Sequence, residues 1–105
     1  MHNAAKTKQD VLDRLHETRE RIAALGVERL GLFGSFVHDT QTAASDVDIL
    51  VEFQPGGKSF DHFMDLCFLL EDVLGREVEL VTKESLSPYI GPHILKEIAY
   101  VPVAA

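Results

Sequence analysis

In residues 46–53 every second side chain, from Val47 to Phe53, is apolar, and this alternation is the strongest constraint on the fold. Successive side chains of an extended strand point to opposite faces, so residues two apart share a face. The apolar face carries Val47, Ile49, Val51 and Phe53, and the opposite face carries Asp46, Asp48, Leu50 and Glu52. The segment predicts a strand with one face against a core and with Asp46 beside Asp48 on the other.

Five further segments predict regular structure around this strand. Apolar residues recur at helical spacing over residues 7–25 and 60–74, and each of these segments ends at a glycine. Residues 27–33 and 77–81 predict strands, and residues 90–100 contain a short amphipathic helix. This order predicts an α/β (α+β) fold, a small mixed sheet with helices mainly on one face. With 105 residues in all, we expect residues 1–105 to form a single domain.

Charge and cysteine usage argue against several classes of protein. A formal net charge of -7 at pH 7 is unfavourable for nonspecific binding to DNA, RNA or an anionic membrane. No apolar run is long enough to span a membrane, and the N-terminus lacks the apolar core of a signal peptide. The single cysteine, Cys67, cannot form an internal disulfide. We therefore expect a cytoplasmic protein that binds neither membranes nor long nucleic acid.

Asp46 and Asp48 predict a site for divalent cations. Two bare carboxylates on one strand face repel each other, and hard divalent ions with oxygen ligands relieve that repulsion. Mg²⁺ is the usual ion of this kind beside a triphosphate. The alternative is that both aspartates form the solvated face of an edge strand.

Gly34 and Ser35 end the strand predicted for residues 27–33. Glycine lets the backbone turn close to a ligand, and a serine hydroxyl and amide after such a turn suit phosphate oxygens. We therefore expect this pair to hold the phosphates of a nucleotide. The alternative is an ordinary turn, because a Gly-Ser pair is common.

The two motifs together resemble the signature of the DNA polymerase beta-type nucleotidyltransferase superfamily. The shared pattern is Leu32-Phe33-Gly34-Ser35, then ten residues, then Asp46-Val47-Asp48 followed by the apolar run 49–51. The resemblance is closer to the minimal nucleotidyltransferases, short bacterial and archaeal proteins often paired with HEPN-domain toxins. It covers residues 11–101 and includes the later segment Val78-Glu79-Leu80-Val81-Thr82.

The resemblance implies a metal-dependent nucleotidyltransferase. It assigns two Mg²⁺ ions to Asp46 and Asp48, and the phosphates of ATP to Gly34 and Ser35. In such enzymes a third acidic residue, commonly an Asp between apolar residues, completes the metal site from a neighbouring strand. Glu79 is our candidate for this catalytic and metal-binding role, and the alternative is that Glu79 faces solvent.

Three further features of the sequence bear on function. Glu77 is a weaker candidate for the third acidic residue. Relatives often have Ala-Arg-Gly shortly after the serine, where this chain has Val37-His38-Asp39, so a titratable group replaces a permanent cation. Residues 100–103 form an apolar tail that is either a contact surface or packed.

The resemblance also implies an acceptor and a partner. It predicts an antitoxin that transfers AMP from ATP to a tyrosine hydroxyl of a cognate HEPN-domain toxin and thereby inactivates its RNase activity. One alternative is a catalytically weak or inactive antitoxin that neutralises by binding, which the departures at His38 and Glu79 favour. Another is a nucleotidyltransferase acting on a small molecule, against which the absence of room for a second substrate-binding domain argues.

Overall fold

A four-stranded sheet forms the centre of the molecule. The computed structural model of the chain describes residues 3–103. The strands are β1 (Val27–Phe33), β2 (Val47–Phe53), β3 (Val78–Thr82) and β4 (Ala99–Pro102), in the spatial order β3-β2-β1-β4. β1 runs antiparallel to both β2 and β4, whereas β2 and β3 are parallel. The prediction of a small mixed sheet is therefore confirmed.

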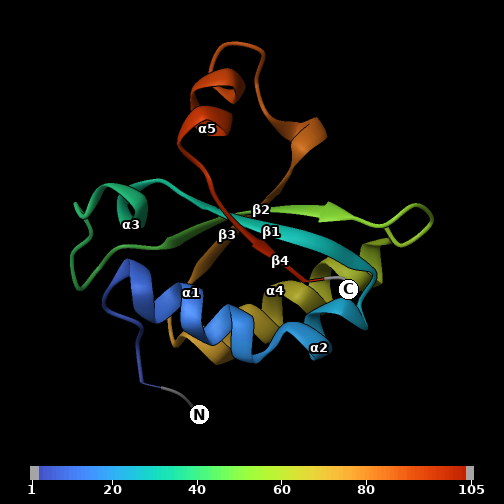
Figure 1. The fold of residues 1–105 in the computed structure, drawn as a ribbon, viewed down its shortest axis with the longest axis horizontal. Coiled ribbons are helices and arrows are strands. Elements are labelled where there is room, and N and C mark those ends of the chain that lie inside the picture. Colours follow the sequence, from blue (N-terminus) through green and yellow to red (C-terminus); the bar gives the residue numbers. More distant parts are fainter. Residues whose placement is uncertain (1–2, 104–105) are drawn as a thin grey trace.

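Helices cover the two sides of this sheet unequally. The helices α1 (Lys8–Glu17), α2 (Arg19–Ala23) and α4 (Phe60–Leu74) lie on one side, and the short helices η1 (Lys83–Ser85) and α5 (Gly91–Glu97) lie on the other (Figure 1). The single turn α3 (Ser35–His38) follows β1 directly. Within residues 3–103, none of the helices combines the length and apolar character needed to cross a lipid bilayer.

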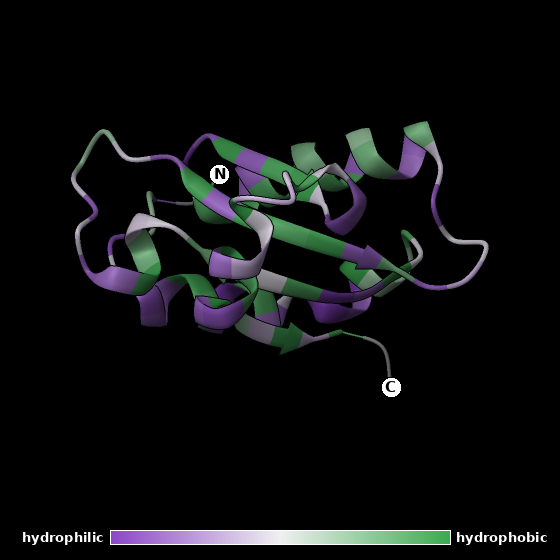
Figure 2. Ribbon diagram, turned by 90° about the horizontal axis from the view of Figure 1, so that it is seen from above, coloured by the Kyte–Doolittle hydropathy of each residue, from purple (hydrophilic) through white to green (hydrophobic). Residues whose placement is uncertain are grey.

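The hydrophobic core lies between the sheet and the layer of α1, α2 and α4. Figure 2 shows the hydrophobic colouring concentrated along the central strands. Helices and strands both contribute fully buried residues, among them Val11, Leu15, Ile22, Leu66, Leu70, Val27, Leu32, Val47 and Ile49. The predicted alternation in β2 holds, because Val47, Ile49 and Val51 are in this core while Asp48 and Glu52 are on the other face.

The helix predicted for residues 7–25 is divided at Thr18. The hydroxyl of Thr18 donates a 2.8 Å hydrogen bond to the carbonyl of Arg14, one turn earlier, and α2 begins at the next residue. Such side-chain bonds to the preceding turn bend helices. The prediction of one continuous helix was therefore wrong at this point.

The short helix predicted within residues 90–100 is present as α5, and a strand that was not predicted follows it. α5 ends at Glu97, and β4 then pairs with β1, with Leu30 opposite Val101. Val101 and Val103 are buried. The apolar tail 100–103 is therefore packed against the sheet through these two valines.

Candidate functional site

The strand register places Asp48 directly beside Glu79. These residues are partners in the parallel pairing of β2 with β3. Directly paired residues of neighbouring strands point to the same face, which here is the face opposite the main core. Asp48 is partly buried and Glu79 is exposed. The structure therefore brings together two of the three acidic residues that the sequence singled out.

The proximity of these carboxyl groups changes the acidity of Asp48. Partial burial, a hydrogen bond with Glu79 and the negative charge of Glu79 together raise the pKa of Asp48 to about 6, and the charge of Asp46 adds to the effect. Burial is the largest of these causes, because a desolvated carboxylate is less stable than a neutral acid. The Asp48 carboxylate is thus held at a position where negative charge is unfavourable.

Asp46 lies outside the regular part of the strand. β2 begins at Val47, so Asp46 is the last residue of the preceding loop, and its side chain is exposed. Glu77 likewise precedes its strand, and its carbonyl accepts a 3.0 Å hydrogen bond from the Val47 amide. Asp46 and Glu77 line the same surface hollow. Asp46 and Glu77 thus lie near each other, each just before the first residue of its strand.

The carboxylates suit a divalent cation by their charge, although they do not form a complete set of ligands. Across residues 3–103, no group of three or more His, Cys, Asp or Glu side chains is placed to hold a metal ion. Asp48 and Glu79 supply neighbouring oxygen ligands whose repulsion a divalent cation would relieve. Asp46, one residue before β2, is a third carboxylate near this pair, since its charge contributes to the raised pKa of Asp48.

Gly34 lies against the Asp48 carboxyl group. Phe33, the last residue of β1, is paired with Asp48 of β2, and Gly34 follows Phe33 directly. Its backbone has φ 77° and ψ -148°, a combination that side-chain-bearing residues rarely adopt. A β-carbon built at Gly34 would overlap the Oδ2 atom of Asp48. The predicted phosphate-binding glycine and the predicted metal-binding aspartate are therefore neighbours in space.

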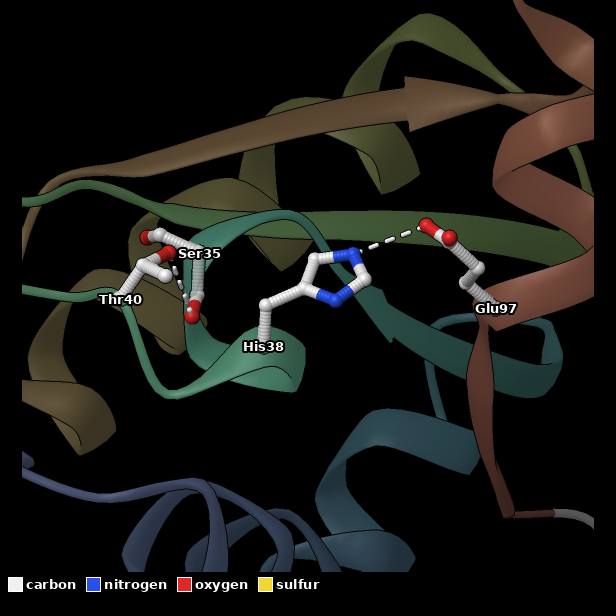
Figure 3. A network of polar contacts seen from close by, with 4 residues as sticks. All are labelled: Ser35, His38, Thr40 and Glu97. Carbon is white, nitrogen blue, oxygen red and sulfur yellow. Dashed lines mark hydrogen bonds and ion pairs between the residues drawn. The ribbon is translucent and has the colours of Figure 1, made fainter.

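Ser35 begins the turn α3, which closes on itself through backbone contacts. The Thr40 amide donates a 3.0 Å hydrogen bond to the Ser35 carbonyl, and the Thr40 hydroxyl contacts the same carbonyl at 3.5 Å (Figure 3). The Val37 amide bonds to the Gly34 carbonyl at 3.1 Å. These contacts fix the backbone that carries Ser35, next to Gly34 and Asp48.

His38, the residue that replaces an expected arginine, is paired with α5. Its Nε2 atom lies 2.8 Å from Oε2 of Glu97, and the ring points away from the Ser35 side chain (Figure 3). Both side chains are about half exposed. Glu97 was not predicted as part of this region, because 59 residues separate it from His38 and no sequence motif connects them.

The opposite end of β2 holds a separate hollow of about 250 Å³. It is lined by Glu52, Lys58, Lys83 and Glu84, with Val51, Phe53 and Gln54. Lys83, the first residue of η1, lies past the end of β3, whereas Glu79 is near its start.

Comparison of the sequence with known families matches a nucleotidyltransferase domain over residues 13–101. A similar protein is the protein adenylyltransferase MntA of Thermococcus cleftensis, which is 44% identical over 85 residues. The match covers 81% of this chain and 82% of MntA. Sequence similarity therefore extends well beyond the two short motifs.

Solved structures share the fold. A structure assigned to the minimal nucleotidyltransferases is similar with a TM-score of 0.68 and 30% identity, covering 84% of this chain and 93% of that one. A toxin-antitoxin complex with AMP-PNP has a TM-score of 0.60 at 20% identity, covering 90% and 72%. A complex of a tri-AMPylated Shewanella oneidensis HEPN toxin with an MNT antitoxin has a TM-score of 0.50 at 19% identity, covering 80% and 68%. At these lower identities the similarity is one of fold.

Proposed function

Because the chain belongs to the nucleotidyltransferase domain family, as one of the minimal nucleotidyltransferases, we propose that it is an antitoxin that adenylylates its partner. The reaction transfers AMP from ATP to a tyrosine hydroxyl of a HEPN-domain toxin and inactivates the toxin's RNase activity. Since such a toxin acts on RNA inside the cell and ATP is available there, we expect the reaction to occur in the cytoplasm.

The observation that carries this proposal is the grouping of Gly34, Asp48 and Glu79 at the same end of the neighbouring strands β1, β2 and β3. Gly34 leaves no room for a side chain beside the Asp48 carboxyl, and Glu79 is the register partner of Asp48. A nucleotide bound against Gly34 and Ser35 therefore has its phosphates beside two acidic groups. Phosphates and carboxylates repel unless a cation lies between them, which is the arrangement that nucleotidyl transfer requires.

The proposed chemistry is an in-line displacement at the α-phosphorus of ATP. The tyrosine oxygen forms a bond to phosphorus, the bond from phosphorus to the bridging oxygen breaks, and pyrophosphate leaves. Asp46, Asp48 and Glu79 would hold the metal ions, and Glu79, the more exposed of the two paired carboxylates, would accept the tyrosine proton. Mg²⁺, when bound, neutralises the charge that develops on the phosphoryl oxygens. Most of the rate acceleration then comes from positioning and electrostatic stabilisation.

Relatives support the choice of acceptor. The similar MntA protein is named as a protein adenylyltransferase, and one protein of the same fold is an MNT antitoxin in complex with a HEPN toxin that is AMPylated. A second complex of this fold contains AMP-PNP, an analogue of ATP. These similarities favour a protein acceptor and an adenine nucleotide for this chain.

The test is to incubate the chain with ATP, Mg²⁺ and the HEPN protein encoded beside it, and to record the intact mass of that partner. We expect the partner to gain adenylyl groups with the wild type and none with Asp48→Asn. The exchange Asp65→Asn removes an exposed carboxylate on α4 and serves as the matched control. Equal labelling by Asp48→Asn and wild type would contradict the proposal.

A second candidate function is neutralisation by binding alone. It is favoured by the pairing of His38 with Glu97, which engages the titratable substitute for the expected arginine away from Ser35. In this case the chain would form a complex with the toxin and protect cells equally well as wild type and as Asp48→Asn. A toxicity assay with both variants, at matched expression, separates the two functions.

A further inference from the structure

Arg76 contacts the loop that leads into Asp46. Its Nη1 atom lies 3.2, 3.2 and 2.9 Å from the backbone carbonyl oxygens of Thr42, Ala43 and Ser45, so that three acceptors share its two hydrogens. Arg76 also lines the surface hollow that Asp46 lines. One side chain, 31 residues away from Ser45 in sequence, therefore binds three carbonyls along the backbone path to Asp46.

The same guanidinium reaches the helix that follows Gly34. It lies over the ring of Phe36, with 5.1 Å between the guanidinium carbon and the ring centroid. This is within the distance at which a cation interacts favourably with an aromatic face. Phe36 is fully buried in α3, two residues after Gly34. Arg76 thus connects the predicted phosphate-binding turn with the predicted metal-binding loop.

Arg76 is itself held in place by two features. It follows Gly75, which ends α4 in a left-handed conformation with φ 64°. Its Nε atom donates a hydrogen bond to the carbonyl of Ala5 in the N-terminal segment. The conformation of Gly75 and the hydrogen bond to Ala5 therefore both orient the Arg76 side chain toward the loop.

Apart from Arg76, the side chain of Gln41 ties the loop to the N-terminal segment, through a 3.1 Å hydrogen bond to the Lys6 carbonyl. Thr42 and Ala44 are exposed, and its own bonds join the Thr42 amide to the Ser45 hydroxyl and the Ser45 amide to the Thr42 carbonyl. These bonds shape the turn locally but do not connect it to the sheet. A lysine in place of Arg76 would keep the positive charge but would lose the Nε donor to the Ala5 carbonyl and the planar group over the Phe36 ring.

We propose that Arg76 is a positioning residue for nucleotidyl transfer, which fixes the approach of Asp46 to Asp48 relative to the turn at Gly34. The proposal rests on the proposed function, because it assigns Asp46 to the metal ions that serve the reaction. Residues that orient metal ligands typically change metal affinity by about 10-fold to 100-fold when they are replaced.

The test compares Arg76→Lys with Arg14→Lys. Arg14 is a matched control, because it also donates to backbone carbonyls, those of Val73 and Leu74, both at 3.3 Å, but at the junction of α1 with α4. Hydrogen–deuterium exchange measures loop order in both variants without nucleotide. We expect residues 42–48 to lose protection in Arg76→Lys and to keep it in Arg14→Lys.

Binding of Mn²⁺ with a non-hydrolysable ATP analogue gives the second measurement. We expect about 10-fold to 100-fold weaker Mn²⁺ binding in Arg76→Lys and unchanged binding in Arg14→Lys. In an Asp46→Asn background, Arg76→Lys should weaken binding no further, because both changes act through the same carboxylate. Additive losses would overturn the proposal.

Two other outcomes are informative. Unchanged exchange of residues 42–48 in a folded Arg76→Lys protein would overturn the positioning role whatever the binding data show. If the loop loosens as expected but the wild type binds no Mn²⁺ and nucleotide, the proposed function fails while the structural part of the positioning role is supported. The exchange and binding measurements therefore separate the failure of one proposal from the failure of the other.

Discussion

Gly34 and the Oδ2 atom of Asp48 lie so close that a β-carbon on residue 34 would overlap the carboxyl oxygen. The backbone of Gly34 also has a conformation, φ 77° and ψ -148°, that favours glycine. Two separate requirements therefore exclude a side chain at this position. One concerns the chain conformation and the other concerns the position of a residue on a different strand.

Replacing Gly34 with alanine should reduce activity more than it reduces stability. Backbone strain of this kind costs about 1–3 kcal/mol. Displacement of Asp48 from the reacting geometry should lower kcat/KM by about 100-fold in the folded fraction. Denaturant unfolding and transfer assays measure the two effects. Gly56→Ala is the control, because Gly56 also has φ 77° but a β-carbon added there would meet no atom within 4 Å, so this variant should lose stability and keep its activity.

The raised pKa of Asp48 predicts how stability depends on pH in the absence of metal. The folded state keeps a proton on Asp48 up to a pKa of about 6, whereas the unfolded chain releases it near 3.8. The folded state therefore binds more protons between these values, and this group lowers stability as pH rises from about 4 to about 6. Well above this pKa the loss is complete.

Asp48→Asn should remove this dependence. We expect the variant to melt a few degrees above the wild type at about pH 7.5 in EDTA, and close to it at about pH 4. The gain is modest because Asp48 is only partly buried, so solvent screens its charge. Melting curves across this pH range, with Asp65→Asn as the control for net charge, measure it. A gain of the same size at both ends of the range would contradict the assignment.

Glu79 and Glu77 should differ in their effect on transfer. Glu79 is the register partner of Asp48, whereas Glu77 precedes β3. Glu79→Gln removes the carboxylate that we propose as metal ligand and proton acceptor, so we expect a loss of about 100-fold in kcat. Glu77→Gln removes the same charge two residues earlier and should change kcat by less than about threefold. Equal losses in the two variants would indicate that net charge, and not the position of Glu79, determines the rate.

The ion pairs of Arg29 and His38 should differ in strength. Arg29 bonds to Glu52 at 2.9 Å across β1 and β2, and lies 3.8 Å from the centroid of the Tyr100 ring. Arg29→Ala should therefore cost about 1–2 kcal/mol. His38→Ala breaks a more exposed pair and should cost less than about 1 kcal/mol. Urea unfolding compares both variants, and a larger loss for His38→Ala would show that the contact with Glu97 holds more of the structure than its exposure suggests.

The sequence predicted those parts of the fold that depend on local pattern. The alternation in residues 46–53 predicted β2 and its faces, and the parallel register then brought Glu79 to Asp48, as the family resemblance required. β4 could not be predicted in the same way, because it has four residues and owes its conformation to pairing with β1, which lies far earlier in the chain. The short helix expected within residues 90–100 is present as α5, whereas the strand that follows it was not expected.

The sequence did not indicate a role for Arg76 for the same reason, because its contacts depend on the tertiary structure. The Gly-Ser and Asp-x-Asp motifs predict Gly34, Ser35, Asp46 and Asp48 as site residues by residue type and spacing. The contacts of Arg76 with Phe36 and with the loop before Asp46 depend on how α4 ends against the sheet. A lone arginine after a helix has no pattern that indicates such contacts, so only the tertiary structure could identify it.

The pairing of β4 also has a consequence for assembly. The Val103 amide bonds to the Glu28 carbonyl at 3.2 Å, so odd-numbered residues of this segment direct their amides inward, toward β1. Pro102 then lies at a position whose backbone faces the open edge of the sheet, and proline has no amide hydrogen to offer. This edge therefore lacks a donor that a further strand would need, and edge-to-edge growth into aggregates is disfavoured there.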